Sequence, residues 1–261
     1  MGSSVCAEPL NSGQGRVCPR TLRRQLDDLQ AGRATPRRTA CSDLLPFDLT
    51  HGRLHEWLGV QGDAASSRQW SPPLELLIEL ARRSMMQQGV GRVVWVGRSV
   101  HPYAVVLGQR GLEACTLLAR SLFVHAQHAS ERLWAADLSL RSRVAAVIAD
   151  GRAFDLRATR RLQLAAEAGG SMCLLARPPW EAGVLSAAAT RWMVSFLRSP
   201  TMTRRWSVEL LRCKGMQPDD RARRARVLEL DRATRALRVA PDVLDGLGET
   251  ATRPPRRART G

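Results

Sequence analysis

The spacing of apolar and polar positions changes twice along residues 144–176, and this stretch organises the prediction for the whole chain. Residues 144–149 form a continuous apolar run that ends at Asp150, which is typical of a strand buried on both faces. Helical spacing follows, and residues 172–176 are a second short apolar run. Strand, helix and strand in this order predict a right-handed parallel crossover.

The helix of this unit has its own start and stop signals. Asp155 is predicted to cap its first turn, and the pair Gly169-Gly170 is predicted to stop the helix. Apolar residues at helical spacing form the face that is predicted to be buried: Ala158, Leu162, Ala165, Ala166 and Gly169. Arg157, Arg160 and Arg161 are placed away from that face.

Similar patterns predict the elements that precede this unit. They are strands at 52–58, 93–96 and 121–126 and helices at 74–88 and 130–141. In the last of these helices, Ser130 is the predicted cap, and Leu133, Trp134 and Leu138 are predicted on the inner side. Trp57 and Trp206 are also expected in the core, whereas Trp70 and Trp180 fall in polar loops.

Three segments after the unit alternate between apolar and polar positions, at 190–197, 205–212 and 226–230. Strands that first alternate with helices and then follow one another predict a mixed sheet. We therefore expect an α/β fold in which helices flank a mostly parallel sheet and antiparallel strands are added at the C-terminal side.

Charge changes this picture by indicating an anionic partner. The 261 residues have a net charge of +16, and residues 191–261 hold 16 Arg and one Lys against eight acidic residues. Nucleic acid is the first candidate for such a chain. Six cysteines are scattered without a CxxC pair, and no apolar run of membrane-spanning length occurs, so the expected location is the cytoplasm, in association with the nucleoid.

The loop at 59–73 lies between a strand and a helix, which is where a phosphate-binding loop would be. Such a loop needs glycines for close backbone approach and a lysine that reaches the phosphates. This loop contains glycines and serines but no Gly-Lys-Ser/Thr, and the lysine of this chain is Lys214. Pro72 and Pro73 occupy the start of the helix. We therefore expect no nucleotide hydrolysis and no bound cofactor.

Other catalytic chemistry also lacks an anchor in the sequence. Asp150 ends a strand where nucleotide hydrolases hold a magnesium-water aspartate, but without a phosphate loop it is better interpreted as a cap of the next turn. The histidine pairs His51/His55 and His125/His128 lack further ligands for a metal, and no GxSxG motif is present. We expect neither a metal site nor an enzyme.

Four stretches of the sequence resemble the ImuA family, the RecA-like accessory proteins of the bacterial induced-mutagenesis cassette, which are also labelled SulA-like. They are GRLHEW at 52–57, ERLWAADLSLRSRVAAVIAD at 131–150, RRLQLAAEAGGSMCLLARP at 160–178 and RRWSVELLRCKG at 204–215. The resemblance extends from about residue 44 to residue 230.

The resemblance implies a RecA-like domain at 43–232 that lacks a functional phosphate-binding loop. It places Gly97 where RecA-type enzymes carry a catalytic glutamate and Asp150 at their magnesium-site aspartate. It also places the two DNA-binding loops of RecA near 151–157 and 177–186. Outside this domain we expect an N-terminal extension at 1–42 with one short helix, and a basic, largely disordered tail at 233–261.

The implied function is that of a non-catalytic adaptor in damage-induced translesion synthesis during the SOS response. Its implied partners are an ImuB-like Y-family protein, an error-prone C-family polymerase and RecA, together with DNA. Eight arginines are the DNA-binding candidates: Arg152, Arg157, Arg160, Arg161, Arg253, Arg256, Arg257 and Arg259. Two alternatives are a cell-division inhibitor that acts on the division-ring GTPase and a RecA-like ATPase with a divergent phosphate loop.

Overall fold

The structure is a computed structural model, and it describes residues 49–61, 70–88, 91–108, 111–112, 115–197, 203–215, 225–231 and 237–240. In these ranges the strands are β1 (Leu54–Leu58), β2 (Val60–Gln61), β3 (Trp70–Ser71), β4 (Val93–Val96), β5 (Gly111–Leu112), β6 (Cys115–Thr116), β7 (Ser121–Val124), β8 (Ala146–Asp150), β9 (Met172–Arg177), β10 (Thr190–Leu197), β11 (Arg205–Cys213), β12 (Arg226–Leu230) and β13 (Leu237–Val239). The α-helices are α2 (Leu74–Gln88), α3 (Ala104–Gly108), α4 (Ala129–Arg141) and α5 (Leu156–Gly169). Short 3-10 turns occur at η2 (Arg98–Val100), η3 (Leu118–Arg120) and η4 (Pro179–Glu181).

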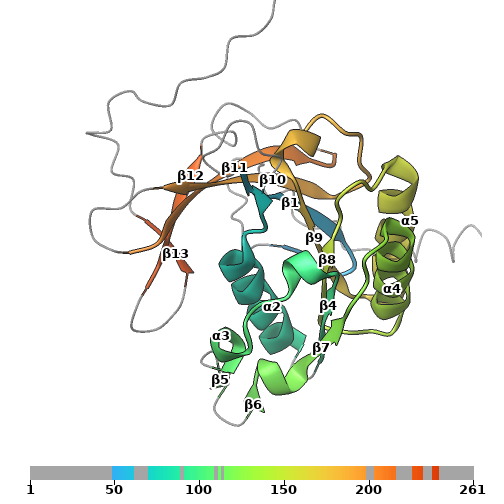
Figure 1. The fold of residues 1–261 in the computed structure, drawn as a ribbon, viewed down its shortest axis with the longest axis horizontal. Helices are drawn as coiled ribbons and strands as arrows, with labels where there is room; N and C mark the ends of the chain where they lie inside the picture. Colours follow the sequence, from blue (N-terminus) through green and yellow to red (C-terminus); the bar gives the residue numbers. More distant parts are fainter. Residues whose placement is uncertain are drawn as a thin grey trace, which may run out of the picture. The chain divides into compact units, whose positions relative to one another are not determined.

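Nine of the described strands form one sheet in the order β13-β12-β11-β10-β1-β9-β8-β4-β7. The six strands from β10 to β7 are parallel, and β11, β12 and β13 continue the sheet antiparallel. Figure 1 shows α2 on one face of the sheet and α4 with α5 on the other. The predicted mostly parallel sheet with antiparallel strands at its C-terminal side is therefore confirmed.

The unit around residues 144–176 forms as its pattern predicts. Strand β8, helix α5 and strand β9 follow one another along the chain, and the two strands pair parallel. The carboxylate of Asp155 accepts a hydrogen bond of 2.8 Å from the backbone N–H of Ala158. Gly170 ends the helix in the left-handed conformation. The predicted apolar face is buried, and Leu162 at its centre has no exposed surface.

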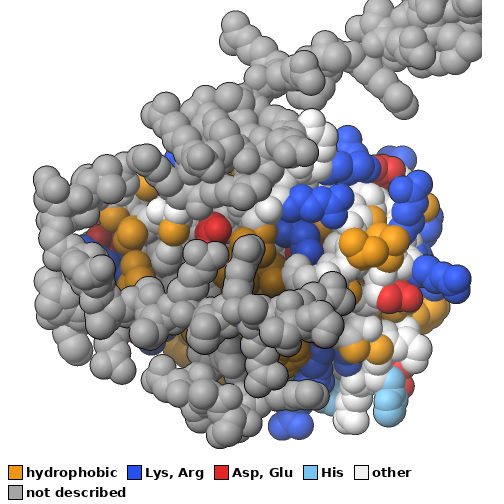
Figure 2. Space-filling model, turned by 90° about the horizontal axis from the view of Figure 1, so that it is seen from above, with side chains coloured by type: hydrophobic (Ala, Val, Ile, Leu, Met, Phe, Trp, Pro, Cys, Tyr) orange, Lys and Arg blue, Asp and Glu red, His pale blue; other side chains and the backbone are white. Residues whose placement is uncertain are grey.

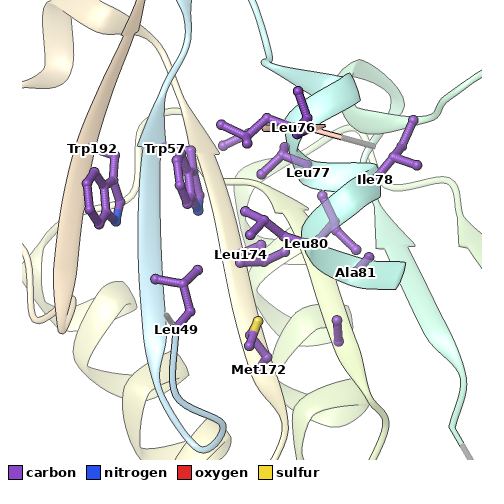
Figure 3. Close-up of a cluster of buried hydrophobic side chains, with 14 of the residues drawn as sticks. Leu49, Trp57, Leu76, Leu77, Ile78, Leu80, Ala81, Met172, Leu174 and Trp192 are labelled. Carbon is purple, nitrogen blue, oxygen red and sulfur yellow. The ribbon is translucent and has the colours of Figure 1, made fainter. Parts of the chain in front are cut away.

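Helix α2 covers the opposite face of the sheet over a second apolar layer. Its residues Leu76, Leu77, Ile78 and Leu80 belong to one buried apolar cluster with Trp57 on β1 and Trp192 on β10, which lie side by side (Figure 3). The two indole rings are stacked, with centroids 5.6 Å apart. The bounds of α2 agree with the predicted helix at 74–88.

Helix α4 differs from its prediction in two respects. Its cap is His128 rather than Ser130, and Glu131 completes a capping box by accepting from the backbone N–H of His128. Trp134 and Leu138, which were predicted on the inner side, are 62% and 52% exposed. Among the polar residues, Arg132 and Asp137 are buried instead.

The predicted extension at 1–42 and the tail beyond residue 240 lie outside the described residues. Strand β13 lies within the range predicted for the tail, and it pairs antiparallel with β12. Among the described residues, no helix has the length and apolar character needed to cross a membrane.

His55 makes the stability of this core depend on pH. Its ring is buried between the Thr190 hydroxyl, at 2.9 Å from Nδ1, and the Thr50 carbonyl, at 3.0 Å from Nε2. The Nε2–H donates to the carbonyl, and Nδ1 accepts from the hydroxyl, so both polar contacts suit the neutral ring. Burial lowers the pKa of His55 from 6.5 to about 4.

We expect the free energy of unfolding to fall as the pH drops from 6.5 toward 4, because in that window the unfolded chain binds a proton that the native chain excludes. Between pH 7.5 and 5.5 the expected loss is roughly 1–2 kcal/mol, measured by urea denaturation at each pH. Protonation of carboxylates contributes little above pH 5.5. His55→Gln is the control, and an equal loss in this variant would contradict the assignment.

Candidate functional site

The two ends of the segment between β1 and α2 pair with each other. The loop folds back on itself, because β2 and β3 pair antiparallel with Val60 opposite Ser71 and Gln61 opposite Trp70. A Cβ at residue 59 would collide with the Ser71 carbonyl and would lie 2.7 Å from the Trp70 ring. The Gly59 N–H donates to the Arg177 carbonyl at 2.8 Å. Residues 62–69 lie outside the described part of the chain.

The first turn of α2 carries a negative charge. Glu75 lies in that turn and forms an ion pair with Arg204, at the start of the β11 region. The N-terminus of a helix attracts anions through its dipole and its free N–H groups. A carboxylate in that turn is unfavourable for an incoming phosphate, and Arg204 offsets part of its charge.

Gly97, where a RecA-type enzyme would carry a glutamate, has no room for a side chain. Its φ of 95° lies in the range that favours glycine, and its N–H donates to the Val124 carbonyl at 3.0 Å. A Cβ there would lie 2.9 Å from Cδ of Arg132 and 3.0 Å from Cβ of Asp150. Arg132 occupies this space, and it donates from Nε to the Asp150 carbonyl and from Nη2 to the Arg152 carbonyl, at 3.0 and 2.9 Å.

The carboxylate of Asp150 is engaged within the protein. One oxygen accepts from the Ser99 hydroxyl at 2.5 Å and the other from the Arg152 backbone N–H at 3.0 Å. The side chain therefore caps the turn that follows β8, as its position at a strand end predicts. No cluster of three or more metal-ligating side chains occurs among the described residues.

A buried charge network joins three neighbouring strands in the middle of the sheet, β9, β1 and β10. Glu56 on β1 receives Nη1 of Arg177 from β9 at 3.0 Å and Nε of Arg191 from β10 at 2.6 Å. The Ser186 hydroxyl adds a third donor at 2.6 Å. Glu56 and Arg177 have no exposed surface, and Arg191 is 6% exposed. Every charge in this network has a partner of opposite sign.

The same network fixes the two loops that the RecA comparison assigns to DNA binding. Arg177 donates to the Phe154 carbonyl at 2.7 Å and pairs with Glu181. Glu181 in turn accepts the backbone N–H of Ala153 at 2.9 Å, and Arg191 donates to the Ala182 carbonyl at 2.9 Å. Both loops are thus tied to the sheet and to each other. Sequence reasoning missed this network, although charged residues inside otherwise apolar strands are a signal for buried pairing.

The predicted arginines fall into three groups. Arg157, Arg160 and Arg161 are exposed on α5 and, with Arg141, Leu156 and Leu164, line one groove of ≈ 440 Å³. Arg152 is exposed in the turn before α5 and is not among the residues that line this groove. The tail arginines Arg253, Arg256, Arg257 and Arg259 lie outside the described residues, so their role stays a prediction.

Asp137 of α4 is not among the residues that line the arginine groove, but it pairs with two arginines that are. It accepts hydrogen bonds from Arg161 at 3.1 Å and from Arg141 at 3.2 Å. Partial burial would raise the pKa of Asp137, but the hydrogen bonds from the two guanidinium groups hold it below its ordinary value. No ion pair to Arg157 or Arg160 is found in the described part of the chain.

Comparison with known proteins gives one clear relationship. The chain is 34% identical over 179 residues to protein ImuA of Caulobacter vibrioides, in strains NA1000 and ATCC 19089, and this match spans 62% of the chain and 71% of the relative. No model of a known protein family matches. Among solved structures, the RadB recombinase aligns with a TM-score of 0.48 and 13% identity, over 74% of this chain and 92% of that one.

Proposed function

This chain belongs to the ImuA family, and on that premise we propose that it is a non-catalytic RecA-like adaptor in damage-induced translesion DNA synthesis. Its proposed partners are an ImuB-like Y-family protein, an error-prone C-family polymerase and RecA. In this role the sheet and its helices serve as a rigid scaffold whose surfaces hold partners together.

The observation that supports the proposal is that side chains of the chain itself lie at described positions to which the resemblance assigns nucleotide chemistry. Trp70 packs over Gly59, Glu75 occupies the first turn of α2, and Arg132 fills the space beside Gly97. A nucleoside triphosphate placed at the first turn of α2 would lie near the Glu75 carboxylate. No lysine is available in the segment between β1 and α2 to bind its phosphates, because the lysine of this chain, Lys214, follows β11.

We expect the purified full-length chain to release no phosphate from ATP above a protein-free blank, with or without single-stranded DNA. The assay is steady-state phosphate release with a RecA-type ATPase run in parallel as the positive control. DNA-stimulated turnover that disappears in Asp150→Ala would contradict the proposal and would support the divergent-ATPase alternative.

The adaptor role itself is tested by co-purification. The full-length chain and its ImuB-like partner are expected to elute as one complex from a size-exclusion column in the absence of nucleotide. A complex that forms only when ATP is added would argue for a nucleotide-dependent switch in place of a constitutive adaptor.

A further inference from the structure

Four large apolar side chains are exposed to solvent on the face formed by α4 and α5. Its large apolar side chains at least 45% exposed are Trp134, Leu138, Leu156 and Leu164. Trp134 and Leu138 are four residues apart on α4, with Arg141 three residues further, so they form one stripe. Leu156, Arg160 and Leu164 form a second stripe on α5 at the same spacing. Asp137 and Arg161, which are 3.1 Å apart, join the two helices directly.

Basic side chains outnumber acidic ones around the groove on this face. Four arginines surround the groove, and Asp137 is shared between two of them. Figure 2 shows blue side chains beside orange ones on the side where Figure 1 places α4 and α5. We define the α4–α5 surface as Trp134, Leu138, Arg141, Leu156, Arg157, Arg160, Arg161 and Leu164.

The combination of large apolar and arginine side chains selects among the possible ligands. Exposed apolar patches with a polar rim mark protein-binding sites, and Trp and Arg are enriched among residues that dominate interface energies. A nucleic-acid backbone would pair with the arginines, but it would leave the leucines and Trp134 in contact with phosphate and water. A second copy of this chain placed face to face would set Arg157, Arg160 and Arg161 against arginines of the same kind.

We propose that the α4–α5 surface binds an amphipathic acidic helix of a partner protein, with apolar residues at i, i+3, i+4 and i+7 and carboxylates beside them. The apolar side chains of that helix would lie on Leu156, Leu164 and Trp134, in the manner of a helix in a groove. Its carboxylates would pair with Arg157 and Arg160, whose planar guanidinium groups donate bidentate hydrogen bonds. This inference rests on the proposed adaptor role and names the partner chemistry for one of its surfaces.

The test uses the full-length chain and a synthetic helical peptide with leucines at i, i+3, i+4 and i+7 and glutamates at the flanking positions, labelled for fluorescence anisotropy. The charge-reversal variant Arg157→Glu/Arg160→Glu and the separate variant Leu164→Asp are each expected to weaken binding at least about tenfold. The matched control is Arg92→Glu/Arg98→Glu, which reverses two exposed arginines outside the groove and is expected to bind as wild type does.

Two further ligands decide between the occupants. A peptide in which glutamine replaces every glutamate is expected to bind at least about tenfold more weakly. A single-stranded oligonucleotide is expected to leave the peptide bound at equal concentration. The proposal fails if the peptide does not bind wild type, if the neutral peptide binds equally well, or if the groove variants bind as wild type does. It also fails if DNA displaces the peptide and loses affinity in the same variants, since the surface would then be a nucleic-acid site.

The chain itself contains an acidic, partly apolar segment close to its basic tail, residues 241–249, with Asp242, Asp245 and Glu249 among its side chains. If removal of residues 241–261 were required before any peptide bound, the groove would belong to this segment, and the partner proposal would be overturned. None of these results depends on ATP. Failure of peptide binding with no ATPase activity would leave the adaptor role standing, whereas ATPase activity would contradict that role whatever the peptide does.

Discussion

Glu56→Gln is expected to lower the free energy of unfolding by about 3–5 kcal/mol, the usual cost of removing one partner from a buried ion pair. The substitution keeps the size of the side chain and removes its charge. It leaves Arg177 and Arg191, both almost fully buried, without the carboxylate on which they converge. That loss is a large share of a typical domain stability of roughly 5–15 kcal/mol.

The matched control is Glu167→Gln, which removes the same charge from an exposed pair. Arg53 and Glu167 are 3.0 Å apart with side chains 46% and 41% exposed, so this variant is expected to lose less than about 1 kcal/mol. Urea denaturation of the two variants beside wild type gives the comparison. Equal losses of unfolding free energy in the two variants would show that water reaches the Glu56 network.

The Glu56 variant also has a local consequence. The network holds the loops at 151–157 and 178–189 through Phe154, Glu181 and Ala182, so both loops are expected to loosen before the sheet unfolds. Amide hydrogen exchange of Ala153, whose N–H donates to Glu181, is the direct measurement. Faster exchange at Ala153 with unchanged exchange in β4 and β8 is the expected pattern.

Leu162→Asp is expected to abolish cooperative folding. Leu162 has no exposed surface and lies between α5 and the sheet, so an aspartate there would be buried in an apolar layer without an assigned partner. The cost of burying such a carboxylate is several kcal/mol, added to the loss of a leucine from the core. Circular dichroism during heating is the measurement. A sharp unfolding transition near the wild-type temperature would show that Leu162 does not face the core.

Leu164→Asp is the control for that experiment. It introduces the same residue two positions along the same helix, where the side chain is 48% exposed. We expect a loss of less than about 1 kcal/mol, because surface substitutions away from special features have small effects. The same variant is expected to lose peptide binding, so a folded but binding-deficient Leu164→Asp would separate the roles of the two faces of α5.

Local sequence signals determined the helices and strands of this protein wherever one side of an element is apolar throughout. The crossover at 144–176 formed with its cap at Asp155 because cap chemistry and helical spacing act over only a few residues. The three alternating segments from residue 190 onward formed β10, β11 and β12, since alternation is also a local signal. Strand β10 pairs parallel with β1, and the pairs β10–β11 and β11–β12 are antiparallel. The absence of a Gly-Lys-Ser/Thr in the loop at 59–73 also needed no structure to be seen.

Tertiary structure alone decided which polar residues are inside. In α4 the leucines and Trp134 suggested the inner face, but Arg132 turns inward to reach carbonyls of the β8 strand end and its turn, and Trp134 remains outside. Glu56 and its arginines are 121 and 135 residues apart in sequence. A charged residue is stable inside only if a distant partner arrives to neutralise it, and no local pattern records that partner. Because Arg132 faces inward on α4, Trp134 and Leu138 face solvent, and they contribute to the exposed apolar surface beside the arginines of α5.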